Sequence, residues 1–137
     1  MQNIFAVQKN EFDHRPSTTD HRRSSMTLFE KIIARDIPAT IVFEDDDFIA
    51  FRDIDPKAPT HVLVVPKKPI ATLNDLSSED AELIGKLIVR AKHIAQAEGI
   101  SESGYRLVFN CNRDGGQSVD HIHCHLLGGR QMKWPPG

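Results

Sequence analysis

The chain has 137 residues, which suits one domain that buries its own core. Hydrophobic residues make up 39% of the chain, charged residues make up 26%, and the formal net charge is −2. This balance is typical of a globular protein and gives no support for nucleic acid as a partner, which needs a basic surface. The sequence has no uninterrupted apolar run of about 18 residues, so we expect no membrane partner either.

Residues 1–26 are polar, carry mixed charges and show no sustained hydrophobic period, so they predict a flexible N-terminal extension. A transit peptide is the alternative, because the segment holds Arg15, Arg22 and Arg23. Such peptides avoid acidic residues, and this one contains Glu11, Asp13 and Asp20. No charged segment followed by an apolar run indicates secretion. We therefore expect a cytoplasmic location, with a nuclear or organellar pool left open.

The folded domain is predicted to span residues 27–137 and to begin with a helix. Thr27 and Glu30 have the spacing of a capping box, in which each side chain accepts a hydrogen bond from a free backbone N–H. An apolar stripe follows: Leu28, Phe29, Ile32 and Ile33. Pro38 is predicted to end this helix, because proline lacks the N–H that a helix needs.

A second helix is predicted after a cap at Ser77 or Ser78. Acidic residues follow the cap, where they suit the positive end of a helix, and apolar residues from Ile84 to Ala95 recur at helical spacing. Gly99 is placed to end the helix. Five strands are predicted by β-rich segments between turn signals, at residues 39–45, 48–53, 60–66, 105–110 and 121–127. Two helices and five strands with short loops indicate an α+β domain with an antiparallel sheet.

Two cysteines, Cys111 and Cys124, lie in apolar, strand-like runs and do not form a Cys-x-x-Cys pair. We interpret them as reduced, buried thiols in a reducing compartment.

His121, His123 and His125 alternate with Ile122 and Cys124 in the last predicted strand. Strand side chains alternate between faces, so the three imidazoles should share one face while the intervening side chains enter the core. A zinc site is one interpretation. The outer two Cα atoms of a straight strand lie about 13 Å apart, whereas Zn–N bonds are about 2.1 Å long. Zinc would therefore require a bent strand or a ligand from elsewhere, such as His61.

Nucleophilic attack on phosphorus is the other interpretation. A neutral imidazole keeps a free lone pair at pH 7, because its reference pKa is about 6.5. The glycine-rich turn before the histidines favours this chemistry. Gly115 and Gly116 let backbone N–H groups approach a phosphate, while Gln117 and Ser118 add side-chain donors.

The segment "GGQSVDHIHCHLLGGRQMKWPPG" resembles the histidine-triad (HIT) family, whose motif is His-φ-His-φ-His-φ-φ with φ an apolar residue. The resemblance extends to "FEKII", "IPATIVFEDD" and "FRDIDPKAPTHVLVVPKK" and covers residues 27–137 almost throughout. More narrowly, the chain resembles the histidine-triad nucleotide-binding proteins, which are purine nucleoside phosphoramidases. This resemblance implies a five-stranded antiparallel sheet with two helices, and a homodimer whose sheets join into ten strands.

The resemblance implies hydrolysis of purine nucleoside phosphoramidates or acyl-adenylates, with no cofactor and no metal. His123 matches the nucleophile that attacks the α-phosphorus and forms a nucleotidyl-histidine, from which water releases the nucleoside monophosphate. His125 matches the residue at the phosphate and the leaving group. Ser118 matches the hydroxyl near the bridging atom of the leaving group. His121 and His61 match a supporting network behind these residues.

A purine nucleotide ligand is also implied. Asp53 matches the carboxylate that holds the ribose hydroxyls, Ile54 lines the base pocket and Asn110 lies near the phosphate. Gly116 and Gln117 belong to the phosphate-binding turn. Four residues match the apolar wall around the purine, and core packing explains them nearly as well: Leu28, Phe29, Ile32 and Phe51.

The C-terminal tail is implied to reach the partner's site through Trp134. Lys133 stands where a histidine is common in this tail, and we expect it to favour acidic substrates. Asp120 stands where an aromatic residue is common. Nucleotidyltransferases of the superfamily usually carry glutamine at the third triad position, so His125 argues against that activity. A dinucleotide polyphosphate hydrolase and a nucleotide-binding regulator or scaffold stay open as alternatives.

Overall fold

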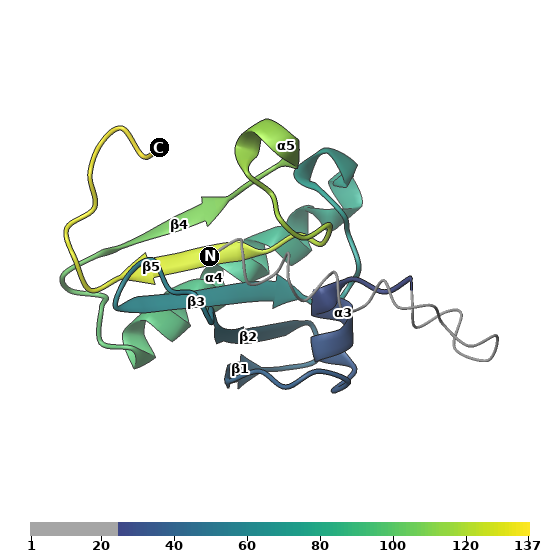
Figure 1. Ribbon diagram of the computed structural model, residues 1–137, viewed down its shortest axis with the longest axis horizontal. Helices are drawn as coiled ribbons and strands as arrows, with labels where there is room; N and C mark the ends of the chain where they lie inside the picture. Colours follow the sequence, from purple (N-terminus) through teal and green to yellow (C-terminus); the bar gives the residue numbers. More distant parts are fainter. Residues whose placement is uncertain (1–24) are drawn as a thin grey trace.

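The computed structural model describes residues 25–137, so most of the predicted extension lies outside the described part. Five antiparallel strands form one sheet in the order β1-β2-β3-β5-β4 (Figure 1). Their bounds are Ile41–Glu44 for β1, Phe48–Arg52 for β2, Thr60–Pro66 for β3, Tyr105–Phe109 for β4 and Cys124–Gly128 for β5. The predicted α+β class and antiparallel sheet are confirmed.

Helix α3 spans Leu28–Ile33 and begins with the predicted capping box. The Glu30 N–H donates to Thr27 Oγ1 over 3.2 Å, and the Thr27 N–H donates to Glu30 Oε1 over 3.0 Å. The helix ends before Pro38, because Arg35 adopts a left-handed φ of 65°. Helix α4 spans Ala81–Ala97 and is followed by Gly99 at φ 76°.

Three short helical turns were not predicted. The 3-10 turns η2 and η3 span Leu73–Asp75 and Ser78–Asp80, and the four-residue α5 spans Asn112–Gly115 inside the glycine-rich turn. None of the helices in residues 25–137 is long and apolar enough to cross a bilayer.

The two longer helices cover opposite faces of the sheet. Phe48 and Ala50 of β2 belong to the apolar cluster under α4, whereas Ile49 and Phe51 belong to the cluster under α3. This division follows the two-residue period of a strand. Figure 1 places α4 behind the sheet and α3 beside the ends of β1, β2 and β3. The α3 face is the one that receives the histidines.

Candidate active site

The three histidines of the motif are all buried, with exposed fractions of 1% to 4%. His123 and His125 have ring centroids 4.9 Å apart. Phe29 of α3 packs edge-on against two of the rings, with its ring centroid 4.9 Å from that of His123 and 6.1 Å from that of His121. The three rings therefore share one face, as predicted, and this is the face on which α3 packs.

The predicted strand over residues 121–127 is wrong at its start, since β5 begins only at Cys124. Before that point the backbone bonds to a loop and not to a neighbouring strand. The His121 N–H donates to the Val119 carbonyl over 2.8 Å, and the Ile122 N–H donates to the Ile70 carbonyl over 2.7 Å. His121 and His123 thus precede the strand, and Asp120 is an exposed residue outside any strand alternation.

His123 has one ring nitrogen fixed by its own backbone. Its Nδ1 lies 2.8 Å from the His121 carbonyl oxygen, which can only accept, so Nδ1 carries the hydrogen. Burial lowers the pKa of His123 to about 4, and the ring is therefore neutral at pH 7. In a neutral imidazole with hydrogen on Nδ1, the lone pair must lie on Nε2. This assignment makes Nε2 a nucleophilic nitrogen.

His125 is in the opposite hydrogen-bonding state, which His61 determines. The Lys57 N–H donates to His61 Nδ1 over 3.0 Å, so the hydrogen of a neutral His61 lies on Nε2. His61 Nε2 then donates to His125 Nδ1 over 2.9 Å. Burial lowers the pKa of His61 to about 4 and that of His125 to about 3. His125 therefore keeps its hydrogen on Nε2.

The Nε2 atom of His125 is buried without a hydrogen-bond partner among the described residues. An unpaired buried N–H costs about 1–3 kcal/mol, and a bound acceptor would remove that cost. A nucleophilic nitrogen on His123 and a free N–H on His125 thus stand on neighbouring rings. We call the contacts from Lys57 N–H through His61 to His125 Nε2 the histidine relay.

The sheet register explains why His61 reaches His125. His61 of β3 pairs with Leu127 of β5, and Leu63 pairs with His125. His61 and His125 are therefore diagonal neighbours on one face, a position from which long side chains touch. His121 is held separately, since its Nε2 donates to the Pro66 carbonyl over 2.7 Å.

Asp53 lies behind the relay and is 4% exposed. Its Oδ1 accepts from the Asp55 N–H over 2.9 Å, whereas Oδ2 has no hydrogen bond from the described residues and lies 3.4 Å from His61 Nε2. Burial raises the pKa of Asp53 to about 6. Its free Oδ2 can accept a hydroxyl donor. Ile54 beside it is 52% exposed.

The glycine-rich turn differs in detail from the predicted phosphate cradle. The Gly116 N–H donates to the Arg113 carbonyl and the Gln117 N–H donates to the Asn112 carbonyl, both over 3.0 Å, so these groups close α5. The Gln117 amide nitrogen donates to the Ala71 and Val119 carbonyls. Gln117 therefore holds the turn in place. Its side-chain N–H groups already donate to these carbonyls, so they are not the phosphate donors that the sequence led us to expect. Ser118 fits better, because its buried Oγ has no partner among the described residues.

The expected purine wall is part of the α3 core. Four residues expected there are 0% to 5% exposed and pack in one cluster: Leu28, Phe29, Ile32 and Phe51. Their packing fits either interpretation of the sequence, and the Phe29 contacts with the histidine rings join this cluster to the site. Asn110 is half-buried just after β4.

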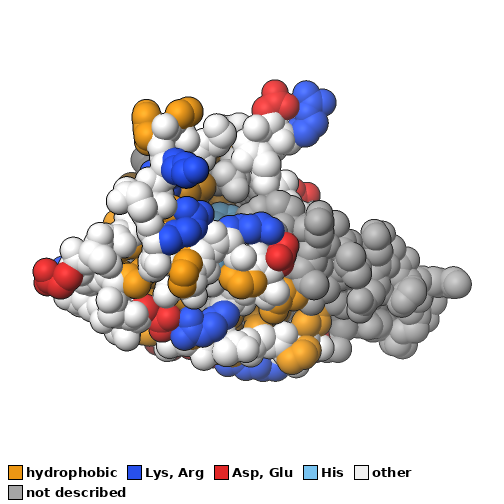
Figure 2. Space-filling view, turned by 60° about the vertical axis from the view of Figure 1, so that its left-hand side comes forward, with side chains coloured by type: hydrophobic (Ala, Val, Ile, Leu, Met, Phe, Trp, Pro, Cys, Tyr) orange, Lys and Arg blue, Asp and Glu red, His pale blue; other side chains and the backbone are white. Residues whose placement is uncertain are grey.

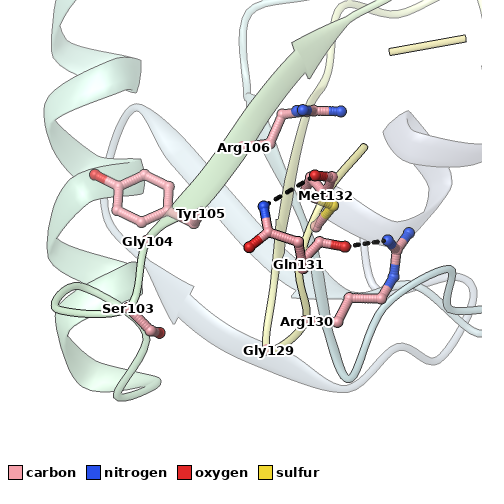
Figure 3. A pocket seen from close by; sticks show the side chains of 8 residues that line it. All are labelled: Ser103, Gly104, Tyr105, Arg106, Gly129, Arg130, Gln131 and Met132. Carbon is pink, nitrogen blue, oxygen red and sulfur yellow. Dashed lines mark hydrogen bonds between the residues drawn. The ribbon is translucent and has the colours of Figure 1, made fainter. Parts of the chain in front are cut away.

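Trp134 is 82% exposed in the tail, and the Arg106 guanidinium lies 6.0 Å from its ring centroid. A cavity of about 490 Å³ lies between the start of β4 and the chain after β5, and Arg106 and Arg130 line it (Figure 3). Figure 2 shows several Lys and Arg side chains on one face of the molecule beside a small area of histidine surface. Such a surface attracts anions.

Cys124 points away from the histidines. It is fully buried in the cluster under α4, and burial raises the pKa of its thiol to about 12. Cys111 is half-buried, and neither cysteine forms a disulfide.

Three of the described residues form one group that could hold a metal ion, and two of them, His61 and His125, belong to the zinc alternative considered from the sequence. One ligand atom from each of Asp53, His61 and His125 lies within 4.8 Å of the others. The 2.9 Å separation of the two imidazole nitrogens is that of a hydrogen bond. Two nitrogens on a tetrahedral zinc, each with a bond of about 2.1 Å, stand farther apart than this. The donors suit zinc chemically, but the histidine relay would have to open.

Two residues of the site were missed in the sequence. Lys57 acts through its backbone N–H and Arg130 contacts the Lys57 carbonyl, and neither contact leaves a signal in residue type or spacing. The proximity of Lys57 to His61 in a two-proline loop is the one feature that pointed to this region.

Comparisons with known proteins agree with this geometry. The HIT domain matches residues 34–132. An uncharacterised HIT-like protein of Synechococcus elongatus is 54% identical over 83% of this chain and 99% of its own length. The purine nucleoside phosphoramidase of Escherichia coli is 56% identical over 77% of this chain and 89% of its own length. The crystal structure of a HIT family hydrolase from Legionella pneumophila has a TM-score of 0.81 and 63% identity, over 82% of this chain and 100% of that one.

Proposed function

The chain belongs to the HIT domain family, and on that basis we propose that it hydrolyses purine nucleoside phosphoramidates and acyl-adenylates. The observation that supports this most directly is the pair of opposite hydrogen-bonding states on neighbouring rings. His123 offers a lone pair at Nε2, and His125 offers an N–H at Nε2. The similarity to a protein named purine nucleoside phosphoramidase supports the substrate class.

In the first step the Nε2 lone pair of His123 attacks the α-phosphorus of the nucleotide. The P–N bond breaks, and its electron pair leaves with the amine nitrogen, which takes up a proton from solvent through the Ser118 hydroxyl. An acyl-adenylate loses a carboxylate in the same way and needs no proton. The His125 N–H donates to a phosphoryl oxygen, where negative charge accumulates in the transition state.

In the second step water attacks the phosphorus of the nucleotidyl-histidine. The attacking water releases one proton to solvent, the P–N bond to His123 breaks with its electron pair returning to Nε2, and the nucleoside monophosphate departs. His123 is suited to both steps because it is neutral before attack and is held by a backbone carbonyl throughout. No cofactor or metal enters this sequence of steps.

The nucleoside is held by groups from four parts of the chain. Asp53 Oδ2 accepts hydrogen bonds from the ribose hydroxyls, and Ile54 lies against the base with the apolar residues of α3. Asn110 and the turn at Gly116 and Gln117 lie on either side of the phosphate and limit where it can sit. Asp53 Oδ2, buried and unpaired among the described residues, is the strongest support for the ribose assignment.

A homodimer would complete the site. Strand β4 is an edge strand whose five residues are all half-buried, and its free edge can pair with a second copy to form a ten-stranded sheet. Trp134 would then reach the partner's site. We also propose residues 27–137 as the HIT domain and a cytoplasmic location for the protein.

Trapping the intermediate tests the function. A single turnover with an adenosine phosphoramidate, quenched without acid, should leave adenylate on His123. His123→Ala should lose nearly all activity, and His123→Gly should regain part of it with added imidazole. Full activity of His123→Ala would refute the nucleophile assignment. Activity lost to a chelator and restored by zinc would favour the zinc alternative.

A dinucleotide polyphosphate hydrolase of the same superfamily remains the second candidate. The free His125 N–H and the unpaired Ser118 Oγ suit a phosphate leaving group as well as an amine. Comparing kcat/KM for a diadenosine polyphosphate and for an adenosine phosphoramidate distinguishes the two. A binding regulator would take up the nucleotide with negligible turnover of either substrate.

A further inference from the structure

Arg130 follows β5 and connects the C-terminal segment to the loop between β2 and β3. Its Nη2 donates to the Lys57 carbonyl over 3.0 Å, and its Nε donates to the same oxygen over 3.3 Å. Its Nη1 donates to the Gln131 carbonyl over 3.2 Å, as Figure 3 shows. No carboxylate of residues 25–137 forms an ion pair with Arg130. The guanidinium is therefore committed to backbone carbonyls.

Lys57 is the residue at which the histidine relay begins. Its carbonyl is held by Arg130, and its N–H donates to His61 Nδ1. The Lys57 side chain points elsewhere, to Asp55 at the exposed surface. Two N–H groups of one guanidinium on one carbonyl restrict the rotation of that peptide, because a charged donor strengthens each bond. The Lys57 N–H lies in the adjoining Pro56–Lys57 peptide, which meets the held Lys57–Ala58 peptide at the Lys57 Cα atom. Arg130, 73 residues away, therefore restrains this N–H through the backbone of Lys57.

The tautomers of two histidines depend on this N–H. If it moves away, the hydrogen of His61 can shift to Nδ1, and His61 Nε2 becomes an acceptor. His125 would then donate from Nδ1 to His61 and carry a lone pair on Nε2. A lone pair there repels a phosphoryl oxygen, whereas the N–H would stabilise it.

We propose that Arg130 is a positioning residue for catalysis, which holds the Lys57 carbonyl and so restrains the adjoining Lys57 N–H, with the result that His125 presents a hydrogen-bond donor to the substrate phosphate. This inference rests on the proposed function. It assigns the C-terminal segment of the same chain a role in the chemical step that is separate from any contact of Trp134 with a partner's site.

Nitrogen NMR of the histidine rings tests the tautomers directly. In the wild type, His61 and His125 should both show a protonated Nε2 and an unprotonated Nδ1. Arg130→Gln should give a population with protonated Nδ1 on both rings, and Arg130→Lys should restore part of the wild-type pattern. Arg106→Gln is the matched control, because Arg106 also donates to a carbonyl of the C-terminal segment, that of Lys133, and does not contact Lys57. An unchanged nitrogen pattern in Arg130→Gln would overturn the proposal.

Kinetics separate this role from a structural one. Removing one preorganised donor costs about 10²–10³-fold in kcat, so its partial loss in Arg130→Gln should lower kcat about tenfold with little change in KM. In a His61→Phe background, which has no relay, Arg130→Gln should cause no further loss. A tenfold loss in both backgrounds would overturn the proposal. Wild-type protein that fails to hydrolyse the phosphoramidate refutes the proposed function instead, and the NMR result still decides the role of Arg130.

Discussion

Lowering the pH from 6 toward 5 should destabilise the fold more steeply than one histidine can explain. Each of His61, His123 and His125 has a pKa of about 3 to 4 in the folded chain, because burial disfavours the charged ring. The same rings titrate near 6.5 once unfolded, at about the reference value. Between these values only the unfolded chain binds the protons, so acid pulls the equilibrium toward unfolding.

The slope follows from counting protons near pH 5. At each of the three histidines the unfolded chain binds about one proton more than the folded chain does. Burial lowers the pKa of His121 as well, which acts in the same direction. Asp53 opposes them, because its folded pKa of about 6 lets the folded chain bind a proton that the unfolded carboxylate does not hold. The net difference of two protons gives a loss of roughly 2.7 kcal/mol per pH unit. The carboxylates whose pKa values are lowered by ion pairs titrate below this window.

Urea unfolding at fixed protein concentration from pH 6.5 to 4.5 measures this slope. Circular dichroism is the better signal, because Trp134 is 82% exposed and a poor reporter of the core. His123→Gln should reduce the slope by about 1.4 kcal/mol per pH unit, since one buried ring no longer titrates. His93→Gln is the matched control, because it replaces an exposed imidazole of α4 in place of a buried one. Equal slopes for wild type and His123→Gln would refute the burial argument.

Three further predictions concern packing and specificity. Phe29→Ala should lower the free energy of unfolding by about 3–5 kcal/mol in urea titrations, because Phe29 is fully buried against two histidine rings; a loss below 1 kcal/mol would contradict that packing. Gly128→Ala would place its Cβ 2.6 Å from Ile100 Cδ1 and should cost about 1–3 kcal/mol, part of which Ile100→Val should recover by removing Cδ1; no recovery would locate the strain elsewhere. Lys133→His should reduce the preference for acidic over basic amino-acid phosphoramidates, measured as a ratio of kcat/KM, and identical preferences would reject a role for Lys133.

Local patterns in the sequence predicted the scaffold well. The capping box at Thr27 and Glu30 depends on a three-residue spacing, and β3 over residues 60–66 depends on a β-rich run ended by proline. Each of these features depends only on residues close together in the sequence, within one helix or one strand. The shared face of the histidines was also predicted, although it depends on the packing of Phe29 as much as on strand alternation.

The features that the sequence did not predict depend on hydrogen bonds to distant backbone groups. Strand β5 starts late because the Ile122 N–H bonds to Ile70, and Gln117 holds the turn because Ala71 supplies an acceptor. The tautomers of the histidines follow from backbone groups of Lys57 and His121. Every residue other than proline offers the same N–H and carbonyl, so residue type cannot reveal which of them will be used.

The orientation of Cys124 limits how this segment reacts with electrophiles and oxidants. A thiol attacks such reagents as its thiolate, and burial under α4 with a pKa of about 12 leaves almost none of that form at neutral pH. Alkylating agents and peroxide should therefore modify Cys124 slowly, even though its neighbours in the chain are nucleophilic and hydrogen-bonding imidazoles. Because Cys124 lies on the face under α4, its sulfur is kept away from the proposed reaction at phosphorus, and we expect the segment to resist oxidative inactivation.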